Sequence, residues 1–433
     1  MTKEHDTGRP RRPVSHYWFV AALSVAILVR LFTLWVVIQH PERAITPDSP
    51  LYLDLSRHFT QAYVNTEAEF SRASVLRTPG YPLFCYLWLH VLGDSITSIL
   101  IAQNVIALAC AWIAFILARR LAGHDAAKWA AVLVLVDPLA LTYANLIRNE
   151  MLFTVVMTLG MLQWHQSLNR PHAASIGLTG FLFGLATLVR PVTSYLMLFI
   201  LPADLWLRHR RAASVMIGAW MLVGFMAPIG GWMARNHQLS GRLTLSSIAE
   251  YNLLYYRVAG AIAEETGETR TAVASRLSSP DSSAPDRLTL EEPLPRMKTA
   301  SMLRLLADHP FGAAMSTIRG MVRMLFGPGT TGLNQLFYGK SAKSGLFVGP
   351  LLAAHMLILY VAMGVGLIFL TRQRCIEPLV LVGAVVMYSL LISAGPEAYS
   401  RFRAPLIPLF AIVSGVGLTR VDGFVRSMAR PAR

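Results

Sequence analysis

Long runs of apolar residues, separated by short polar connections, dominate the pattern of this chain. A helix needs about 17 to 25 apolar residues to cross a bilayer, and on that measure the runs predict about ten crossings. They cover residues 17–38, 96–118, 129–143, 151–164, 174–189, 192–207, 212–233, 346–370, 378–393 and 404–418. The pattern therefore predicts an all-α polytopic membrane protein with about ten transmembrane helices.

The connections between these runs alternate in charge. Basic residues near the ends of membrane spans are retained in the cytoplasm. The N-terminal arm, the connections after the second, fourth, sixth and eighth runs, and the C-terminal tail all carry Arg, Lys or His. We therefore expect both termini to be cytoplasmic, with the other connections on the outer side. The first run is longer than the apolar stretch of a signal peptide and is expected to stay as an anchor.

Composition agrees with a membrane protein, because 54% of the residues are hydrophobic, 15% are charged and the mean hydropathy is +0.47. The formal net charge of +15 fits cytoplasmic loops facing anionic lipid headgroups, and it implies no nucleic-acid partner. The three cysteines suggest neither a structural disulfide nor a zinc site, since no paired spacing occurs.

Two outer connections are too long to be simple links, and connections of that length are usually functional. The first, residues 39–97, contains two stretches with helical spacing that are expected to lie along the membrane interface. The second, 234–346, has a Ser-, Thr- and Pro-rich centre expected to be partly disordered, followed by an amphipathic interfacial stretch at 302–326. The predicted domains are a basic arm, an N-terminal transmembrane catalytic module, the second outer loop, the C-terminal helices and a tail: 1–16, 17–233, 234–346, 347–420 and 421–433.

Six arginines stand at the outer corners of apolar runs, where basic residues should be scarce. They are Arg77, Arg148, Arg190, Arg235, Arg401 and Arg403. A single arginine there can be explained by its side chain reaching lipid phosphates. Six together indicate a site for an anionic ligand.

Several of these residues stand in short motifs that occur in a fixed order. After the first run come Asp48 and Tyr52, then RTPGYPLF, a DP…Y…RNE corner, GLATLVRP, GGWMARNHQLSGRLTLS and finally SRFRAPLIPLF. This order resembles the GT-C type glycosyltransferases that use polyprenyl-phosphate sugars, in particular the bacterial protein mannosyltransferase-like and aminoarabinose transferase-like groups. The resemblance extends over about residues 17–420. It departs at Ser49, where many relatives carry a second acidic residue.

The resemblance implies the GT-C architecture and an activity. It implies transfer of a sugar from a polyprenyl-phosphate-linked donor to a lipid, glycan or protein acceptor, at the periplasmic face of a bacterial inner membrane. No cofactor is predicted. A divalent cation is possible but not indicated, because Ser49 leaves Asp48 without an acidic partner.

Such a reaction needs a carboxylate to take the proton of the acceptor hydroxyl and fixed positive charge to stabilise the departing phosphate. Asp48 is the candidate general base; the alternative is that it caps the helix that follows. Glu150 is predicted to bind the sugar or the acceptor, with a local salt bridge to Arg148 as the alternative. Asp54 is a reserve for the base.

Arginine suits the phosphate because its planar guanidinium group binds two oxygens at once and stays charged. The residues predicted to bind the donor phosphate are, first, Arg77, Arg235 and Arg401 and, behind them, Arg148, Arg190 and Arg403, with Asn236 beside Arg235. Three tyrosines, Tyr52, Tyr81 and Tyr399, are candidates to contact sugar, although interfacial belts also favour tyrosine. We expect a cavity between Asp48 and Arg235 with a lipid groove opening sideways.

Two other functions remain open. A transporter or flippase of an anionic lipid-linked substrate would also need the arginines, although a transporter is expected to carry ionisable groups near the membrane midplane. An inactive scaffold with the same fold is the third.

Overall fold

The structure is a computed structural model that describes residues 16–208, 214–278, 298–339 and 348–428. The basic arm, most of the polar centre of the second outer loop and the end of the tail lie outside these residues. Within the described residues every regular element is helical and no strand occurs. The all-α fold class is therefore confirmed.

Six of the described helices are long and apolar enough to cross a membrane. Five of them are regular helices, namely α1 (His16–Gln39), α5 (Ile96–Ala122), α11 (Ser214–Ser240), α18 (Val348–Arg372) and α19 (Ile376–Ser393). The sixth begins as a 3-10 segment, Ser400–Leu406, and continues as α20 (Ile407–Met428). A bent pair, α6 (His124–Val136) and α7 (Pro138–Ala144), makes a seventh if it is counted as one span; the two helices meet at 54°.

The other predicted spans are shorter or more polar helices. α8 (Glu150–Asn169) is long but contains glutamine and histidine, α9 (Ala173–Val189) has 17 residues, and α10 (Met197–Arg208) has 12 with a proline inside. Helices of this kind can cross a bilayer only as part of a packed bundle, because their backbone or polar groups need protein partners. The predicted count of ten therefore stays a prediction.

The first outer connection forms three helices: α2 (Ser49–Arg57), α3 (Ala68–Leu76) and α4 (Gly80–Leu92). A proline in the first turn of α2 fits the start of this helix, because its fixed backbone angle suits that position. The second predicted helix is α4, which ends at Gly93, a residue with φ of 97° that glycine tolerates. α3 was not anticipated, because its short, mixed sequence carries little periodicity.

The second outer connection is also helical where it is described. It contains α12 (Ile248–Asn252), α13 (Ala259–Thr266), α14 (Arg270–Ser278), α15 (Thr299–Asp308), α16 (Pro310–Phe326) and α17 (Thr330–Tyr338). The amphipathic stretch expected over 302–326 is two helices rather than one, since Pro310 cannot continue the α15 backbone pattern and begins α16 instead. α16 leaves an apolar face exposed, consistent with the interfacial placement that remains a prediction: Phe311, Ile318, Val322 and Phe326.

Close helix packing at glycines fixes the bundle. A Cβ added at Gly180 on α9 would lie 1.9 Å from the carbonyl oxygen of Met221 on α11. A Cβ at Gly417 on α20 would lie 1.9 Å from the Ala362 carbonyl on α18. Small residues let such backbones touch.

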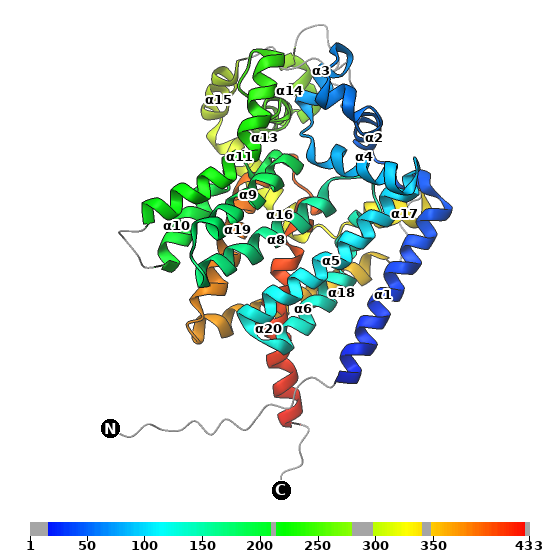
Figure 1. Ribbon diagram of the computed structural model, residues 1–433, viewed down its shortest axis with the longest axis vertical. Helices are drawn as coiled ribbons and strands as arrows, with labels where there is room; N and C mark the ends of the chain where they lie inside the picture. The colour runs from blue at the N-terminus through cyan, green and yellow to red at the C-terminus, as the bar shows by residue number, and fades with distance from the viewer. Residues whose placement is uncertain (1–15, 209–213, 279–297, 340–347, 429–433) are drawn as a thin grey trace.

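Figure 1 shows the resulting arrangement. α2, α3 and α4 lie at one end of the bundle together with α13, α14 and α15, whereas α1 begins and α20 ends at the opposite end. Helices from the two long connections thus lie together at one end of the bundle. Residues that stand far apart in the sequence can therefore meet there.

Candidate functional site

Asp48 lies in the turn before α2, and arginine side chains from three other segments converge on its carboxylate. Arg77 Nη2 lies 2.9 Å from Asp48 Oδ1, and Arg148 Nη2 lies 2.6 Å from Oδ2. Arg401 Nη1 lies 3.5 Å from Oδ2. Asp48 occupies the N-cap position of α2, but its side chain makes no capping hydrogen bond. The capping alternative is therefore wrong for this carboxylate.

A second carboxylate adjoins the first through a shared arginine. Glu150 Oε2 lies 3.4 Å from Arg148 Nε, and Glu150 Oε1 lies 3.7 Å from Arg190 Nη1. The salt bridge to Arg148 considered for Glu150 is thus present. We call Asp48, Glu150, Arg77, Arg148, Arg190 and Arg401 the arginine cluster. Four guanidinium groups and two carboxylates leave it with a net charge of +2 when all are ionised.

The carboxylates of the arginine cluster are largely buried. The Asp48 side chain is 24% exposed and that of Glu150 only 1%. Burial raises the pKa of the Asp48 carboxyl, but the neighbouring guanidinium groups of Arg77 and Arg148 more than offset this, so the pKa lies below its ordinary value. Asp48 is therefore ionised at neutral pH and is held as an anion among cations.

Aromatic rings hold the arginines in place. The Arg77 guanidinium lies 5.1 Å from the centroid of the Tyr52 ring. Phe402 is shared by two of them, since Arg190 lies 4.8 Å and Arg401 4.9 Å from its centroid. Rings at these distances attract a guanidinium group and limit its motion. Phe402 was missed in the sequence because an aromatic residue in an apolar motif carries no distinctive signal.

The corner between α7 and α8 presents Arg148 and Glu150. Its backbone is tied to the Asp48 turn by Ser49, whose hydroxyl donates to the Ile147 carbonyl oxygen at 2.8 Å. Asn149 Nδ2 donates to Tyr52 Oη and to the Val189 carbonyl oxygen, both at 3.1 Å. Asn149 thereby links the corner to the end of α9, immediately before Arg190. Its place in the RNE motif was the signal that could have marked it.

Ser49 stands where many GT-C relatives carry the second acid. Its hydroxyl is buried and also lies 2.8 Å from the Thr46 backbone nitrogen. Among the described residues no group of three or more His, Cys, Asp or Glu side chains is placed to hold a metal ion. The residues present around Asp48 are cations, which do not fit a divalent ion next to that carboxylate.

Two predicted phosphate ligands lie outside the arginine cluster. Arg235 donates to the Ala62 carbonyl oxygen at 2.6 Å and to Ser74 Oγ at 2.9 Å. Asn236 is buried and donates to the carbonyl oxygens of Thr244 and Leu245, at 3.0 and 3.2 Å. Both residues tie the end of α11 to neighbouring segments. The structure does not bring them to Asp48.

Arg403 is buried as well and donates to the carbonyl oxygens of Met324 and Leu325. These carbonyls lie at the C-terminal end of α16, where a cation is favourable because the last carbonyls of a helix lack partners and carry negative partial charge. The structure therefore gives Arg403 a role in holding α16. It does not bring this arginine to Asp48.

Two of the three candidate tyrosines contact the arginine cluster, whereas the third tyrosine and Asp54 do not. Tyr52 contacts Arg77, and Tyr399 lies beneath Arg401, 4.7 Å from its guanidinium group. Tyr81 is fully buried behind Tyr52, with ring centroids 4.9 Å apart, and does not face the cluster. Asp54 pairs with the exposed side chain of His58 at 3.2 Å.

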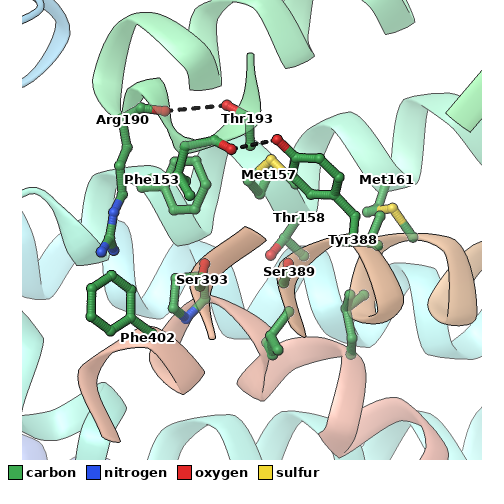
Figure 2. Close-up of a pocket in the computed structure, with 15 residues that line it drawn as sticks. Phe153, Met157, Thr158, Met161, Arg190, Thr193, Tyr388, Ser389, Ser393 and Phe402 are labelled. Carbon is green, nitrogen blue, oxygen red and sulfur yellow. Dashed lines mark hydrogen bonds between the residues drawn. The ribbon is translucent and has the colours of Figure 1, made fainter. Parts of the chain in front are cut away.

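A cleft opens beneath Arg190 and descends between α8, α19 and the start of α20 (Figure 2). Its cavity volume is only about 20 Å³, so the cleft is narrow. Arg190 and Phe402 lie at one side of it, while Met161 and Tyr388 lie toward the other. The Tyr388 hydroxyl is already engaged, because it donates to the Val192 carbonyl oxygen. The predicted cavity was placed toward Arg235, and this cleft lies at Arg190 instead.

Comparisons with known proteins agree with this fold. Residues 76–232 match the family model of dolichyl-phosphate-mannose-protein mannosyltransferases, a little over a third of the chain. This segment contains Arg77, Arg148, Glu150 and Arg190. No curated protein matches the chain by sequence.

Solved structures with a similar fold include two enzymes. The oligosaccharyltransferase of Archaeoglobus fulgidus, tethered with an acceptor peptide, superposes with a TM-score of 0.50 and 11% identity over 96% of this chain. The chain spans only 51% of that protein's length. ArnT from Cupriavidus metallidurans, bound to undecaprenyl phosphate, gives a TM-score of 0.42 and 14% identity, covering 94% of this chain and 79% of the other.

The chain thus has a multi-pass helical fold that is similar to the fold of the GT-C type oligosaccharyltransferase over 96% of its length. The family match confirms the resemblance to GT-C type glycosyltransferases that the order of motifs predicted.

Proposed function

We propose that this chain is an integral-membrane glycosyltransferase that transfers a sugar from a polyprenyl-phosphate-linked donor to an acceptor hydroxyl. The observation that carries the proposal is the convergence of Arg77, Arg148 and Arg401 on the carboxylate of Asp48. The matched family supports the donor class, since its description names dolichyl-phosphate-mannose.

The charge of the arginine cluster suits the leaving group. A sugar linked to a lipid phosphate carries one negative charge, and the lipid phosphate carries up to two once the sugar has left. A cluster with a net charge of +2 stabilises the departing phosphate more than the bound donor, which is the condition for lowering the barrier. Binding of the phosphate lets the guanidinium groups of Arg77 and Arg148 exchange the carboxylate for phosphate oxygens.

That exchange frees Asp48 to act as the general base. The acceptor oxygen attacks the anomeric carbon, the bond from that carbon to the phosphate oxygen breaks, and the phosphate leaves with the electron pair. The acceptor proton passes to Asp48. Asp48 has a low pKa while it is paired with arginines, so its affinity for a proton increases only as the phosphate draws those arginines away.

Glu150 and Arg190 occupy the side of the cluster next to the cleft. We assign Glu150 to hydrogen bonding with the sugar or the acceptor, because its Oε2 atom has no hydrogen-bond partner among the described residues. We assign the first part of the isoprenoid chain to the cleft, whose cavity of about 20 Å³ has to widen to admit that chain. The cleft follows α8 from Phe153 to Met161, a length of about 12 Å at 1.5 Å per residue, and apolar side chains predominate along it.

The membrane placement follows from the alternation of basic connections. We propose a bacterial inner (plasma) membrane protein with both termini in the cytoplasm and the arginine cluster at the periplasmic face. The start of α1 and the end of α20 lie at one end of the bundle, and α2, which follows Asp48, lies at the other, which supports this orientation. The acceptor is a lipid, a glycan or a protein, and the sugar a hexose or a pentose.

The test is transfer of a labelled sugar from polyprenyl-phosphate donors to a membrane acceptor fraction by the purified, lipid-reconstituted protein. Asp48→Asn should lose at least about 100-fold in rate, the scale of a missing general base. Asp54→Asn is the matched control and should stay near the wild-type rate, because Asp54 pairs with His58 away from the cluster. If Asp48→Asn stays active, Asp48 is not the base.

The same assay distinguishes a transferase from a transporter or a scaffold. A wild-type protein that binds polyprenyl phosphate but transfers no sugar from any donor contradicts the proposal and favours a transporter or a scaffold. Substrate movement in sealed vesicles then distinguishes those two.

A further inference from the structure

Gln103 is a fully buried amide inside the apolar helix α5, about 10 Å below its outer end at 1.5 Å per residue. A polar side chain in a membrane span is costly unless its hydrogen bonds are satisfied, so such residues usually have a function. Gln103 Oε1 accepts from the Tyr81 hydroxyl at 2.8 Å. Its Nε2 donates to the carbonyl oxygens of Ala144 and Leu146, at 3.1 and 2.9 Å. Every hydrogen-bonding atom of the amide is therefore used.

These partners lie immediately beside the two arginines closest to Asp48. Tyr81 belongs to the first turn of α4, four residues after Arg77. Ala144 and Leu146 stand four and two residues before Arg148. One amide thus connects the two backbone segments that carry Arg77 and Arg148.

We propose that Gln103 is a positioning residue that sets the separation of Arg77 and Arg148 and thereby the geometry of the Asp48 site. The proposal rests on the transferase function proposed above. Gln103 touches no substrate in this account; it acts through Tyr81 on one side and through the corner before α8 on the other.

The aromatic packing explains how a bond at Tyr81 reaches Arg77. The Tyr81 ring meets the Tyr52 ring edge-on, with centroids 4.9 Å apart, and the Arg77 guanidinium lies over the Tyr52 ring, 5.1 Å from its centroid. Close-packed rings transmit a displacement because the interior leaves little free space. A shift of α4 relative to the corner therefore moves Arg77 relative to Arg148.

Asn104, the next residue on α5, is a natural control. Its Nδ2 donates to the Ala144 carbonyl oxygen at 3.2 Å and to Asn145 Oδ1 at 3.1 Å. Asn104 therefore also holds the corner, but no hydrogen bond joins it to α4 among the described residues. A residue that merely supports the corner should behave like Asn104, whereas a residue that sets the separation of the arginines should not.

The first experiment compares Gln103→Leu with Asn104→Leu in the sugar-transfer assay. We expect Gln103→Leu to lower kcat/KM for the donor by about 10- to 100-fold, the scale of an ångström-size misplacement. It should also move the acid limb of the pH–rate profile to higher pH. Asp48 faces Arg77, Arg148, Arg401 and the carboxylate of Glu150, and arginines that are held less firmly lower the pKa of Asp48 less. Asn104→Leu should leave the acid limb in place.

Tyr81→Phe breaks only one of the three hydrogen bonds of Gln103, and it conserves the ring. Its effect on the acid limb should add nothing to that of Gln103→Leu in the double variant, since both act through one connection. Full additivity would contradict the proposal. Tyr81→Phe also tests the proposal on its own if the Gln103→Leu protein does not fold.

A second measurement does not depend on sugar transfer. The pKa of Asp48 is lower in the folded protein than in the unfolded chain, so its ion pairs stabilise the fold above the unfolded pKa and this stability is lost as pH falls through the folded pKa. The unfolding temperature should therefore fall more between pH 7 and pH 4 in wild type than in Asp48→Asn.

The fall in unfolding temperature between pH 7 and pH 4 thus differs between proteins with and without the Asp48 carboxylate. Gln103→Leu should reduce this difference, and Asn104→Leu should leave it unchanged. If wild type transfers no sugar, the proposed function fails, yet the unfolding temperatures still report on the arginines. If Gln103→Leu keeps both the acid limb and the full Asp48-dependent difference in unfolding temperature, Gln103 only packs α5 against its neighbours.

Discussion

Arg77 and Arg235 show how two arginines in similar sequence contexts acquire different roles. Arg77 directly follows α3 and Arg235 lies near the end of α11, and each lies over an aromatic ring. Arg77 bonds a carboxylate, whereas Arg235 bonds a backbone carbonyl oxygen and a serine hydroxyl. The charge of Arg77 therefore affects the protonation of Asp48, and that of Arg235 contributes to local structure.

Substitution of the two arginines should affect the pH dependence of sugar transfer differently. Arg77→Gln removes one of the cations that lower the pKa of Asp48, while burial, which raises it, remains. The base form of Asp48 is then lost at a higher pH, so the acid limb of kcat/KM should move upward, in addition to a loss of rate. The measurement is a pH–rate profile of sugar transfer from pH 4 to pH 8.

Arg235→Gln is the matched variant. It should lower the unfolding temperature because it leaves the Ala62 carbonyl oxygen and Ser74 without their donor, but the acid limb should stay at the wild-type position. An acid limb that shifts equally in both variants would show that the low pKa of Asp48 does not depend on its direct ion pair with Arg77.

The helices α9 and α11 determine where Arg190 stands. α9 ends at Val189, one residue before Arg190, and α11 packs directly on α9 at Gly180. Membrane helices gain little from the hydrophobic effect on association, so their stability depends on such close backbone packing. The position of Arg190 beside Glu150 is thus set by a contact deeper in the bundle.

Gly180→Ala should separate the two helices, because the added Cβ would lie 1.9 Å from the Met221 carbonyl oxygen. Overpacking of this kind costs about 1 to 3 kcal/mol of stability. Gly230→Ala on α11 is the control, since a Cβ there meets nothing within 4 Å. Thermal unfolding in detergent should show a clear decrease for Gly180→Ala alone, and equal unfolding temperatures would contradict the packing described.

Across the whole molecule, α2, α3, α13, α14 and α15 lie at one end and the start of α1 lies at the other. The turn between α18 and α19 contains Cys375, which is partly exposed, whereas Cys85 and Cys110 are buried. A native cysteine therefore reports on the orientation of the protein without any substitution.

A membrane-impermeant maleimide should label Cys375 in inverted inner-membrane vesicles and leave it unlabelled in intact spheroplasts. The expectation follows from the cytoplasmic assignment of the basic TRQRC connection. Cys375→Ser should abolish the signal, because Cys85 and Cys110 are shielded by burial. Labelling in intact spheroplasts would reverse the proposed orientation and place the arginine cluster in the cytoplasm.

The sequence by itself determined the all-α fold class, and it singled out as candidates the residues that form the arginine cluster. Apolar runs are read directly as membrane helices, since the bilayer fixes their length and their backbone bonds are local. Charged residues beside such runs are conspicuous because they are costly there, so Asp48, Arg77 and Arg148 could be singled out together with Glu150.

Only the tertiary structure decided which charges meet. Arg235 and Arg403 carry the same local signal as Arg77, and their separation from Asp48 depends on how helices far apart in sequence pack. The same holds for Gln103, whose partners stand 22 to 43 residues away. Hydrogen bonds between distant segments leave no periodic trace along the chain, and for that reason the spacing of the arginines around Asp48 comes from the packed helices alone.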